Sequence, residues 1–333
     1  MEKIKVNLSY LTYSTIINDA EAFQIYKANG EINKNEIFNR IVANLSTYDF
    51  ENKTKKKNKY YDILSDVIVD SKTINDLIEK LEQANEINKI KRNDVYDQVV
   101  MIRPTKVYED VFNKIIYNYL DNISISSYFR NLFDYYASLY QEERERIIFK
   151  KELDRVNEAT NHSLSIKIKI GNSISTFNVY KVVTSKEKLF NYVLGVMETP
   201  SNKRKTLSIH LNKLNDVIIT NKASVLYKNE IDMLDNMIKV GPQFIAGEFI
   251  DAKVQLTNLG LRKYRNIFLN RPVPYKKEEN ILYFKCSRNQ LFQYFSRFGV
   301  DAFVIEPKIL RDDVLKYHQS SYENIIRKSK HEK

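Results

Sequence analysis

Lys3, Lys5 and Asn7 are the first side chains of this sequence that could do chemistry, and they alternate with aliphatic residues over positions 3–8. Strict alternation predicts a β-strand with one polar face that carries two ammonium groups and an amide. Ammonium groups bind phosphate oxygens, and a ribbon of two such strands fits the major groove of a nucleic acid duplex. An ordinary edge strand with solvated lysines has the same pattern.

Two helical patterns follow this strand within residues 1–50. One stops at Asn29-Gly30, a suitable left-handed cap, and the next starts at Asn33, with Glu36 in the position of a capping box. One strand and two helices bury too little apolar surface to fold alone. The segment therefore resembles a ribbon-helix-helix domain, in which a second copy supplies the missing strand, and we expect a homodimer.

Asn33 and Lys34 stand where the second helix begins. The exposed amides and the positive dipole end of a helix N-terminus can hold a phosphate group, so both residues are candidates for contact with a nucleic acid backbone. Most helix N-termini bind only water, and that alternative stays open.

The composition limits the classes of protein that are possible. The chain has 333 residues, enough for two or three domains, and its one cysteine, Cys286, excludes an internal disulfide framework. The four histidines stand too far apart for a familiar zinc spacing, and no glycine-rich phosphate loop is present, so we expect neither a metal nor a cofactor. We find no apolar run of about twenty residues and no signal peptide, so we expect a cytoplasmic protein that does not enter a membrane.

The net charge of +11 is unevenly distributed along the chain. Residues 60–150 carry a net −4, whereas residues 1–59 carry +3 and residues 151–222 and 223–333 carry +6 each. A basic excess of this kind suits a polyanionic partner. A sequence so rich in Lys, Asn, Ile and Tyr also fits simple bias from an AT-rich genome.

The periodicity of the apolar residues predicts an α+β multidomain chain. Residues 60–160 are helical in pattern and predict a connector, while the lysine-rich run at 52–59 predicts a mobile loop. The pattern changes to alternation at Ser163, and about five short strands in the next roughly sixty residues favour a small closed or half-closed β-barrel over 161–222, because an open sheet would leave bare edges. Residues 223–333 alternate strands with helices and predict an α+β extension.

Residues 156–220 resemble the WYL domain of bacterial regulators, a small barrel of the Sm or SH3 type. The family's Trp-Tyr-Leu triplet falls on Asn191-Tyr192-Val193, and its Phe-Arg-Leu-Asp-Arg-Ile segment falls on residues 209–214. His210 and Lys213 stand in place of the two arginines of that segment. The resemblance implies a pocket for an anionic ligand, with less positive charge than is usual in the family.

The order of the parts is similar to that of the WYL accessory proteins of type VI-D CRISPR systems. The stretch 294–307, followed by Leu310, looks like the C-terminal extension that follows WYL domains. This resemblance implies a protein partner, an RNA-guided RNA nuclease that the protein assists. It also implies binding of single-stranded RNA.

A barrel of this kind can bind single-stranded RNA through cations that follow the backbone and aromatic rings that stack on bases. Alternating aromatic residues in strands are more often core residues, and a run of lysines is often only a solvated loop. Tyr180 and Phe190 are further candidates for stacking. We expect the following side chains to line one groove: Lys167, Lys169, Tyr192, Lys203, Arg204, Lys205, His210 and Lys213.

No arrangement of residues in the sequence supports catalysis. The chain has no G-x-S-x-G elbow, no Arg-x-x-x-x-His nuclease pattern and no reason for Cys286 to meet a histidine. We therefore expect a non-catalytic protein that binds single-stranded RNA and modulates an RNA-guided, RNA-targeting CRISPR effector nuclease. The alternative is a transcription regulator that binds duplex DNA through its ribbon and uses the WYL domain as a sensor. A protein-interaction adaptor that binds no polyanion is a third candidate.

Overall fold

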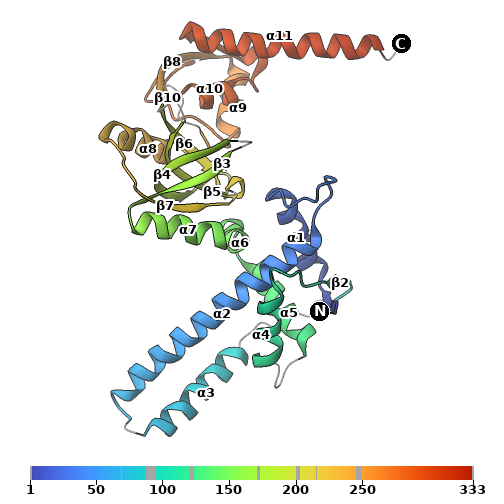
Figure 1. Ribbon diagram of the computed structural model, residues 1–333. Helices are drawn as coiled ribbons and strands as arrows, with labels where there is room; N and C mark the ends of the chain where they lie inside the picture. Colours follow the sequence, from blue (N-terminus) through green and yellow to red (C-terminus); the bar gives the residue numbers. More distant parts are fainter. Residues whose placement is uncertain are drawn as a thin grey trace. The chain divides into compact units, whose positions relative to one another are not determined.

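The computed structural model describes residues 2–68, 70–87, 95–119, 124–170, 173–199, 203–214, 216–244 and 249–331. They form two compact units, Met1–Lys150 and Lys151–Lys333, that combine helices with antiparallel sheets (Figure 1), so the predicted α+β class is confirmed. No helix in the described ranges has both the length and the apolar character needed to span a membrane.

The first unit contains β1 (Ile4–Leu8), α1 (Tyr10–Ala22), α2 (Lys34–Ser65), α3 (Ser71–Ile87), β2 (Gln98–Ile102), α4 (Glu109–Tyr119), α5 (Ile125–Ser138) and α6 (Gln141–Ile148). The second unit contains α7 (Lys150–Asn161), β3 (Leu164–Ile170), β4 (Ser173–Thr184), β5 (Asn191–Glu198), β6 (Arg204–His210), the short helix η1 (Leu211–Lys213), β7 (Ile218–Ala223), α8 (Lys228–Val240), β8 (Phe249–Leu256), α9 (Asn258–Asn266), β9 (Lys276–Glu278), β10 (Ile281–Ser287), α10 (Arg288–Phe295), η2 (Gly299–Asp301), β11 (Ala302–Glu306) and α11 (Lys308–His331).

The first strand finds a partner in its own chain. β1 pairs antiparallel with β2, with Val6 opposite Val100 and Lys5 opposite Met101, and α5 packs against β1. We expected a second copy to supply the missing strand and residues 60–160 to be helical throughout, and β2 corrects both expectations. The sequence did not predict β2, because a short apolar run of five residues fits a buried helix equally well.

α2 is longer than the sequence predicted. It begins after Asn33, whose Oδ1 accepts a hydrogen bond from the Glu36 backbone N–H (3.2 Å), as expected of a helix cap. It then continues to Ser65 through the run at 52–59, which the sequence predicted to be a loop. Lysine favours the helix, and this run contains neither glycine nor proline, so nothing in it breaks the backbone. α3 packs beside α2 (Figure 1).

The central sheet has five antiparallel strands in the order β6-β5-β4-β3-β7. β6 and β7 are its two edges, and within the described ranges no pairing joins them, so the sheet is open and the predicted closed barrel is corrected. Leu194 and Val196 of β5 pack instead with Leu234 and Met237 of α8. The helix buries apolar surface that a closed barrel would have buried inside itself.

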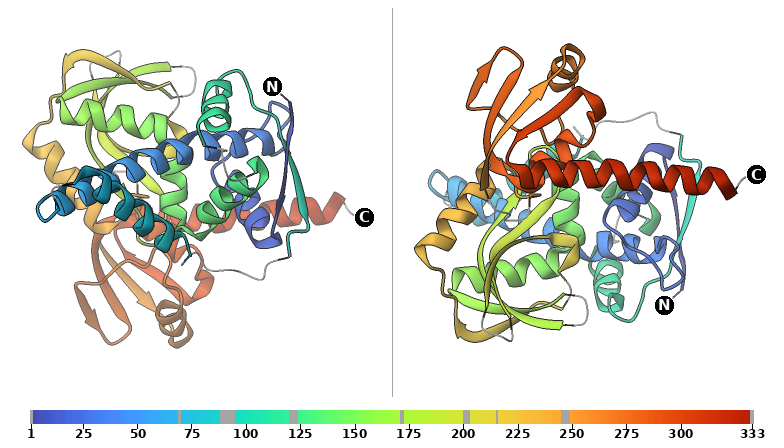
Figure 2. Two further views of the ribbon diagram at one scale, coloured as in Figure 1. Left: turned by 90° about the horizontal axis from the view of Figure 1, so that it is seen from below. Right: turned by 90° about the horizontal axis from the view of Figure 1, so that it is seen from above.

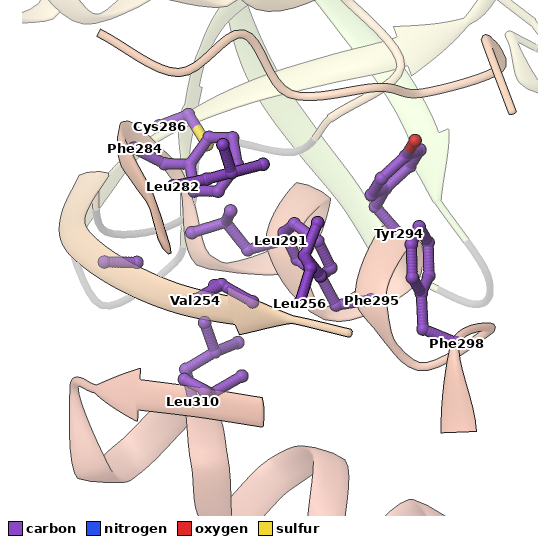
Figure 3. Close-up of a cluster of buried hydrophobic side chains, with 12 residues drawn as sticks. Val254, Leu256, Leu282, Phe284, Cys286, Leu291, Tyr294, Phe295, Phe298 and Leu310 are labelled. Carbon is purple, nitrogen blue, oxygen red and sulfur yellow. The ribbon is translucent and has the colours of Figure 1, made fainter. Parts of the chain in front are cut away.

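A second antiparallel sheet, in the order β11-β8-β10-β9, forms the C-terminal part of the second unit. α9, α10 and the start of α11 supply the other half of its core (Figure 3), in which the Phe284 and Phe295 rings lie 5.4 Å apart. Strands and helices alternate here, as the periodicity predicted. α11 continues past this sheet (Figure 2).

Candidate nucleic-acid interface

Lys3, Lys5 and Asn7 lie on or next to β1, but their surroundings differ from the expected ribbon. Lys3 and Lys5 are exposed, and Asn7 is half-buried. Across the ribbon, Lys5 faces Met101 and Asn7 faces Val99, and these two apolar side chains are 52% and 57% exposed. The outward face is therefore half apolar, whereas two identical strands would have made it wholly polar.

The N-terminus of α2 is already in contact with other parts of the first unit. Lys34 donates from Nζ to the Tyr13 hydroxyl (2.8 Å), and its ammonium lies 5.5 Å from the centroid of that ring. The Asn35 side chain makes two hydrogen bonds to the Arg103 backbone, each 2.9 Å long, which hold the end of β2 against the first turn. Asn33 is the cap of this helix, and a phosphate contact by Asn33 or Lys34 stays a prediction.

The exposed lysines of the central sheet form two pairs. Lys167 and Lys169 project from β3, while Lys203 and Lys205 lie at the start of β6, and all four are exposed. The register aligns Lys167 with Arg204 through Thr176 and Glu198, so Lys203 and Lys205 point to the face opposite that of Lys167 and Lys169. The sheet therefore carries one pair of cations on each face in place of the single groove that we expected.

Arg204 is engaged within the fold. Its guanidinium forms ion pairs with Glu230 (Nε to Oε1, 2.7 Å) and with Glu198, donates to the Val225 carbonyl oxygen (2.7 Å) and lies 4.7 Å from the Tyr227 ring centroid. The hydrogen bond to Glu230 is the main cause of a raised pKa at Arg204. The side chain joins β6 to β5 and α8, so its donors are engaged within the fold, and a contact between Arg204 and RNA stays a prediction.

Tyr192 and His210 belong to an aromatic stack. The His210 ring centroid lies 4.5 Å from that of Phe190 and 4.8 Å from that of Tyr192. Burial, followed by the nearby charges of Lys213 and Lys188, lowers the pKa of His210 to about 4, so the imidazole is neutral near pH 7. Tyr192 is only 7% exposed. His210 is thus neutral near pH 7 and Tyr192 is largely buried, and contact of either residue with RNA stays a prediction.

Lys213 is exposed, as predicted, and the structure adds Lys188 beside it. Both ammonium groups lie close enough to His210 to lower its pKa. We did not single out Lys188 from the sequence, although its position in a Lys-Glu-Lys loop just before Phe190 could have indicated it as a candidate. We call Lys188, Phe190, His210 and Lys213 the His210 cluster. Two cations beside an aromatic stack form an arrangement that can hold a phosphate next to a base.

Cys286 is a core residue of the C-terminal sheet. Burial raises the pKa of its thiol to about 12, so the sulfur stays protonated at neutral pH. Among the residues that the structure describes, no group of three or more His, Cys, Asp or Glu side chains is placed to hold a metal ion.

Comparisons with known proteins find similarity in structure only. No family model matches the chain, and no curated protein matches it. A proteasome accessory factor B/C of Arthrobacter aurescens aligns over 52% of this chain and 27% of its own, with 14% identity and a TM-score of 0.24, too loose a superposition to carry an argument. A solved structure of a CRISPR Cas-related protein superimposes over 98% of this chain and 95% of its own, with 18% identity and a TM-score of 0.69. The chain therefore shares the fold of that protein along nearly its whole length.

Proposed function

We propose that this protein is a non-catalytic accessory protein of the WYL type that binds single-stranded RNA in the cytoplasm and modulates an RNA-guided, RNA-targeting CRISPR effector nuclease. The observation that carries the proposal is the fold shared over 98% of the chain with a CRISPR Cas-related protein. The net charge of +11 agrees with a polyanionic ligand. The ribbon-helix-helix likeness of the N-terminus belongs to the same proposal.

The exposed charges of the second unit support contact with a flexible strand. The Lys167 and Lys169 pair, the Lys203 and Lys205 pair and the His210 cluster place cations at three positions of one sheet. A flexible single strand can bend to reach cations that point to different faces of a sheet, whereas a duplex presents its phosphates at fixed spacing. Separate pairs of lysines therefore favour single-stranded RNA over duplex DNA.

The ribbon in the first unit gives less support to the alternative, a DNA-binding transcription regulator. Readout in the major groove needs polar side chains from both strands of the ribbon. Here Val99 and Met101 occupy the outward positions of β2, so only Lys3, Lys5 and Asn7 remain to read bases. The titration that tests the proposal therefore compares duplex DNA with single-stranded RNA.

The test is a titration of labelled single-stranded RNA and labelled duplex DNA at several salt concentrations. For a single strand that contacts about five phosphates, the logarithm of affinity should fall with the logarithm of salt concentration with a slope of about −3.5. Replacing Lys203 and Lys205 together by Glu removes about two of those contacts, so the slope should flatten to about −2. Lys72→Glu on α3 is a matched reversal of an exposed lysine and should leave the slope unchanged.

Three results would contradict the proposal. Tighter binding of duplex DNA than of RNA would favour the regulator, and no binding of either would favour a protein-interaction adaptor. An unchanged slope in the Lys203 and Lys205 variant would remove this pair from the interface. Modulation is tested separately, by adding the protein to an RNA-guided RNA nuclease encoded beside it and measuring the rate of target cleavage.

We also propose that the protein is a homodimer. β2 supplies the strand that we expected from a second copy. The support for a dimer therefore comes from α11, the last helix of the chain. Leu315, Tyr322 and Ile325 on α11 are each 64% to 65% exposed, and Ile326 is 36% exposed. A stripe of this kind is suited to packing against a second helix with the same pattern.

A further inference from the structure

The C-terminal sheet has one face covered by helices and one face that they leave uncovered. Its elements follow the order β8, α9, β9, β10, α10, β11, and its strands lie in the order β11-β8-β10-β9. This is a β-α-β-β-α-β arrangement with the first and third strands in the middle. The helices pack on the side of Val254 and Phe284 (Figure 3). Side chains alternate along a strand, so their neighbours in sequence point to the opposite face.

Tyr283 occupies the middle of the uncovered face. It lies on β10 directly opposite Lys253 of β8 and Lys276 of β9. The two ammonium groups stand 5.5 Å and 5.1 Å from the centroid of its ring. Tyr275, which is 64% exposed, places its own ring 6.3 Å from that of Tyr283. Tyr283 is therefore half-buried between two lysines on the uncovered face, with the exposed Tyr275 ring beside it.

Further aromatic side chains share this face. Phe303 of β11 is 54% exposed and pairs in register with Gln255, and Phe249 at the start of β8 is 38% exposed. The fold gives these rings no core to enter, because the core of this sheet lies on its other side. Exposed aromatic residues gathered on one surface indicate a binding site.

Acidic residues on the same face limit its electrostatic attraction. Glu278 accepts a hydrogen bond from the Tyr283 hydroxyl (2.6 Å) and pairs with Lys276 (2.6 Å), while Asp251 lies opposite Lys285. The Glu278 contacts fix the orientation of the Tyr283 ring between its lysines. Since carboxylates offset much of the positive charge, stacking and not charge would dominate binding here.

We infer that the uncovered face of the C-terminal sheet is a stacking platform for single-stranded RNA, with bases on Tyr283 and Tyr275 and the adjoining phosphates near Lys253 and Lys276. Sheets with exposed aromatic residues on central strands bind single-stranded RNA in this manner in other proteins. The inference rests on the proposed function and adds to it a second contact surface, separate from the lysines of the central sheet.

The first test compares two substitutions of one residue. Tyr283→Ala removes the ring and should weaken binding of a labelled oligouridylate of roughly 20 nucleotides by between about fivefold and a hundredfold. Tyr283→Phe keeps the ring, loses only the Glu278 hydrogen bond and should bind within about twofold of the wild type. Because stacking releases no counterions, the salt slope should stay unchanged in both variants. Tyr117→Ala, which changes an 83% exposed tyrosine on α4 in the first unit, is the matched control.

The second test uses the absence of tryptophan from the chain. Tyr283→Trp introduces a single fluorescent reporter on the platform, and a base stacked on it should quench its emission as RNA is added. Tyr117→Trp places the same reporter on α4 and should not respond. Circular dichroism melts of all variants check that each one folds.

The outcomes separate this inference from the proposed function. If the wild type binds no RNA, both are overturned. If the wild type binds RNA while Tyr283→Ala binds equally well and Tyr283→Trp shows no quenching, the platform alone is overturned. Loss of affinity in Tyr283→Ala with retained affinity in Tyr283→Phe, together with quenching at position 283 only, supports it.

Discussion

At the scale of single residues, His210 shows how packing decides the charge of a side chain. Its ring lies against Phe190 and Tyr192, and its pKa falls from 6.5 to about 4 because burial penalises the imidazolium and because Lys213 and Lys188 repel it. An unfolded chain has no such environment, so there the histidine titrates near its ordinary value. The folded and unfolded states therefore bind different numbers of protons between these two pH values.

We expect the second unit to lose stability as the pH falls through this window. Above about pH 6.5 His210 is neutral in both states and its contribution is fully present. As the pH falls further, the unfolded state takes up the proton first, so stability is lost progressively until the pH reaches about 4. The loss should be about 1 to 2 kcal/mol, because solvent partly screens a half-buried ring. Urea unfolding at a series of pH values measures it.

His210→Phe supplies the comparison for this measurement. Phenylalanine keeps an aromatic ring beside Phe190 and Tyr192 but cannot titrate, so the variant should lose less stability than the wild type over the same range. His162→Gln changes an exposed histidine outside the stack and should follow the wild type. If the stability of His210→Phe falls with pH in parallel with that of the wild type, the loss comes from protonation of carboxylates and not from His210.

At the scale of elements, Asn39 joins two segments that are far apart in the sequence. It is fully buried on α2, donates from Nδ2 to the Arg103 carbonyl oxygen (3.0 Å) and accepts at Oδ1 from the Thr105 backbone N–H (3.4 Å). These bonds hold the segment after β2 against α2. Since β2 is the strand that pairs with β1, the position of Lys5 depends on this buried amide.

Replacing Asn39 by Ala should destabilise the first unit by about 1 to 3 kcal/mol, because a fully buried amide and its hydrogen bonds to the Arg103 and Thr105 backbone are lost. Asn35→Ala is the matched control, since it removes hydrogen bonds to the same Arg103 backbone where water can replace them, and it should cost less than about 1 kcal/mol. Urea unfolding gives both values, and hydrogen exchange measured by mass spectrometry reports on β1 and β2. Equal losses in the two variants would show that burial of the amide is unimportant.

The elements that the sequence predicted well are those with a local signal. The alternation that starts at Ser163 corresponds to β3, and the strands expected to alternate with helices over 223–333 include β8 and β10. β9 gave no such signal, because its three residues are all charged and pair only with β10 at the edge of the sheet. The open central sheet could not be foreseen either, since it depends on α8 packing across β5.

The same distinction applies to the candidate site. The exposure of Lys167 and Lys169 follows from alternation within β3 alone. The environment of Arg204 depends on Glu230, and that of His210 on Lys188, and only the folded chain brings these residues together. A sequence pattern can therefore predict which side chains carry charge, but not which of them the fold has already paired or neutralised.

At the scale of the whole molecule, α11 presents a surface that the described chain leaves uncovered. Leu310 and Val314 anchor its start in the C-terminal core, but from Leu315 onward every side chain that the structure describes is exposed or half-buried. In proteins most of the stability of a helix comes from packing of its apolar face, and this later half buries little of its own surface. Its apolar residues at 315, 322 and 325–326 recur on one face, so packing against a second copy would supply the support that is missing.

The wild-type protein should therefore run as a dimer at micromolar concentration, with twice the chain mass of 39.4 kDa by light scattering. Leu315→Asp and Ile325→Asp each place a charge in the apolar stripe and should yield monomers whose helical circular dichroism signal is weaker, because the unsupported half of α11 frays. Arg327→Asp is the control, since this exposed residue lies about 120° around the helix from Leu315 and about 160° from Ile325. A monomeric wild type would contradict the dimer itself. Dimers in all three variants would instead move the contact to the free edge of β1, where the ribbon-helix-helix likeness places it.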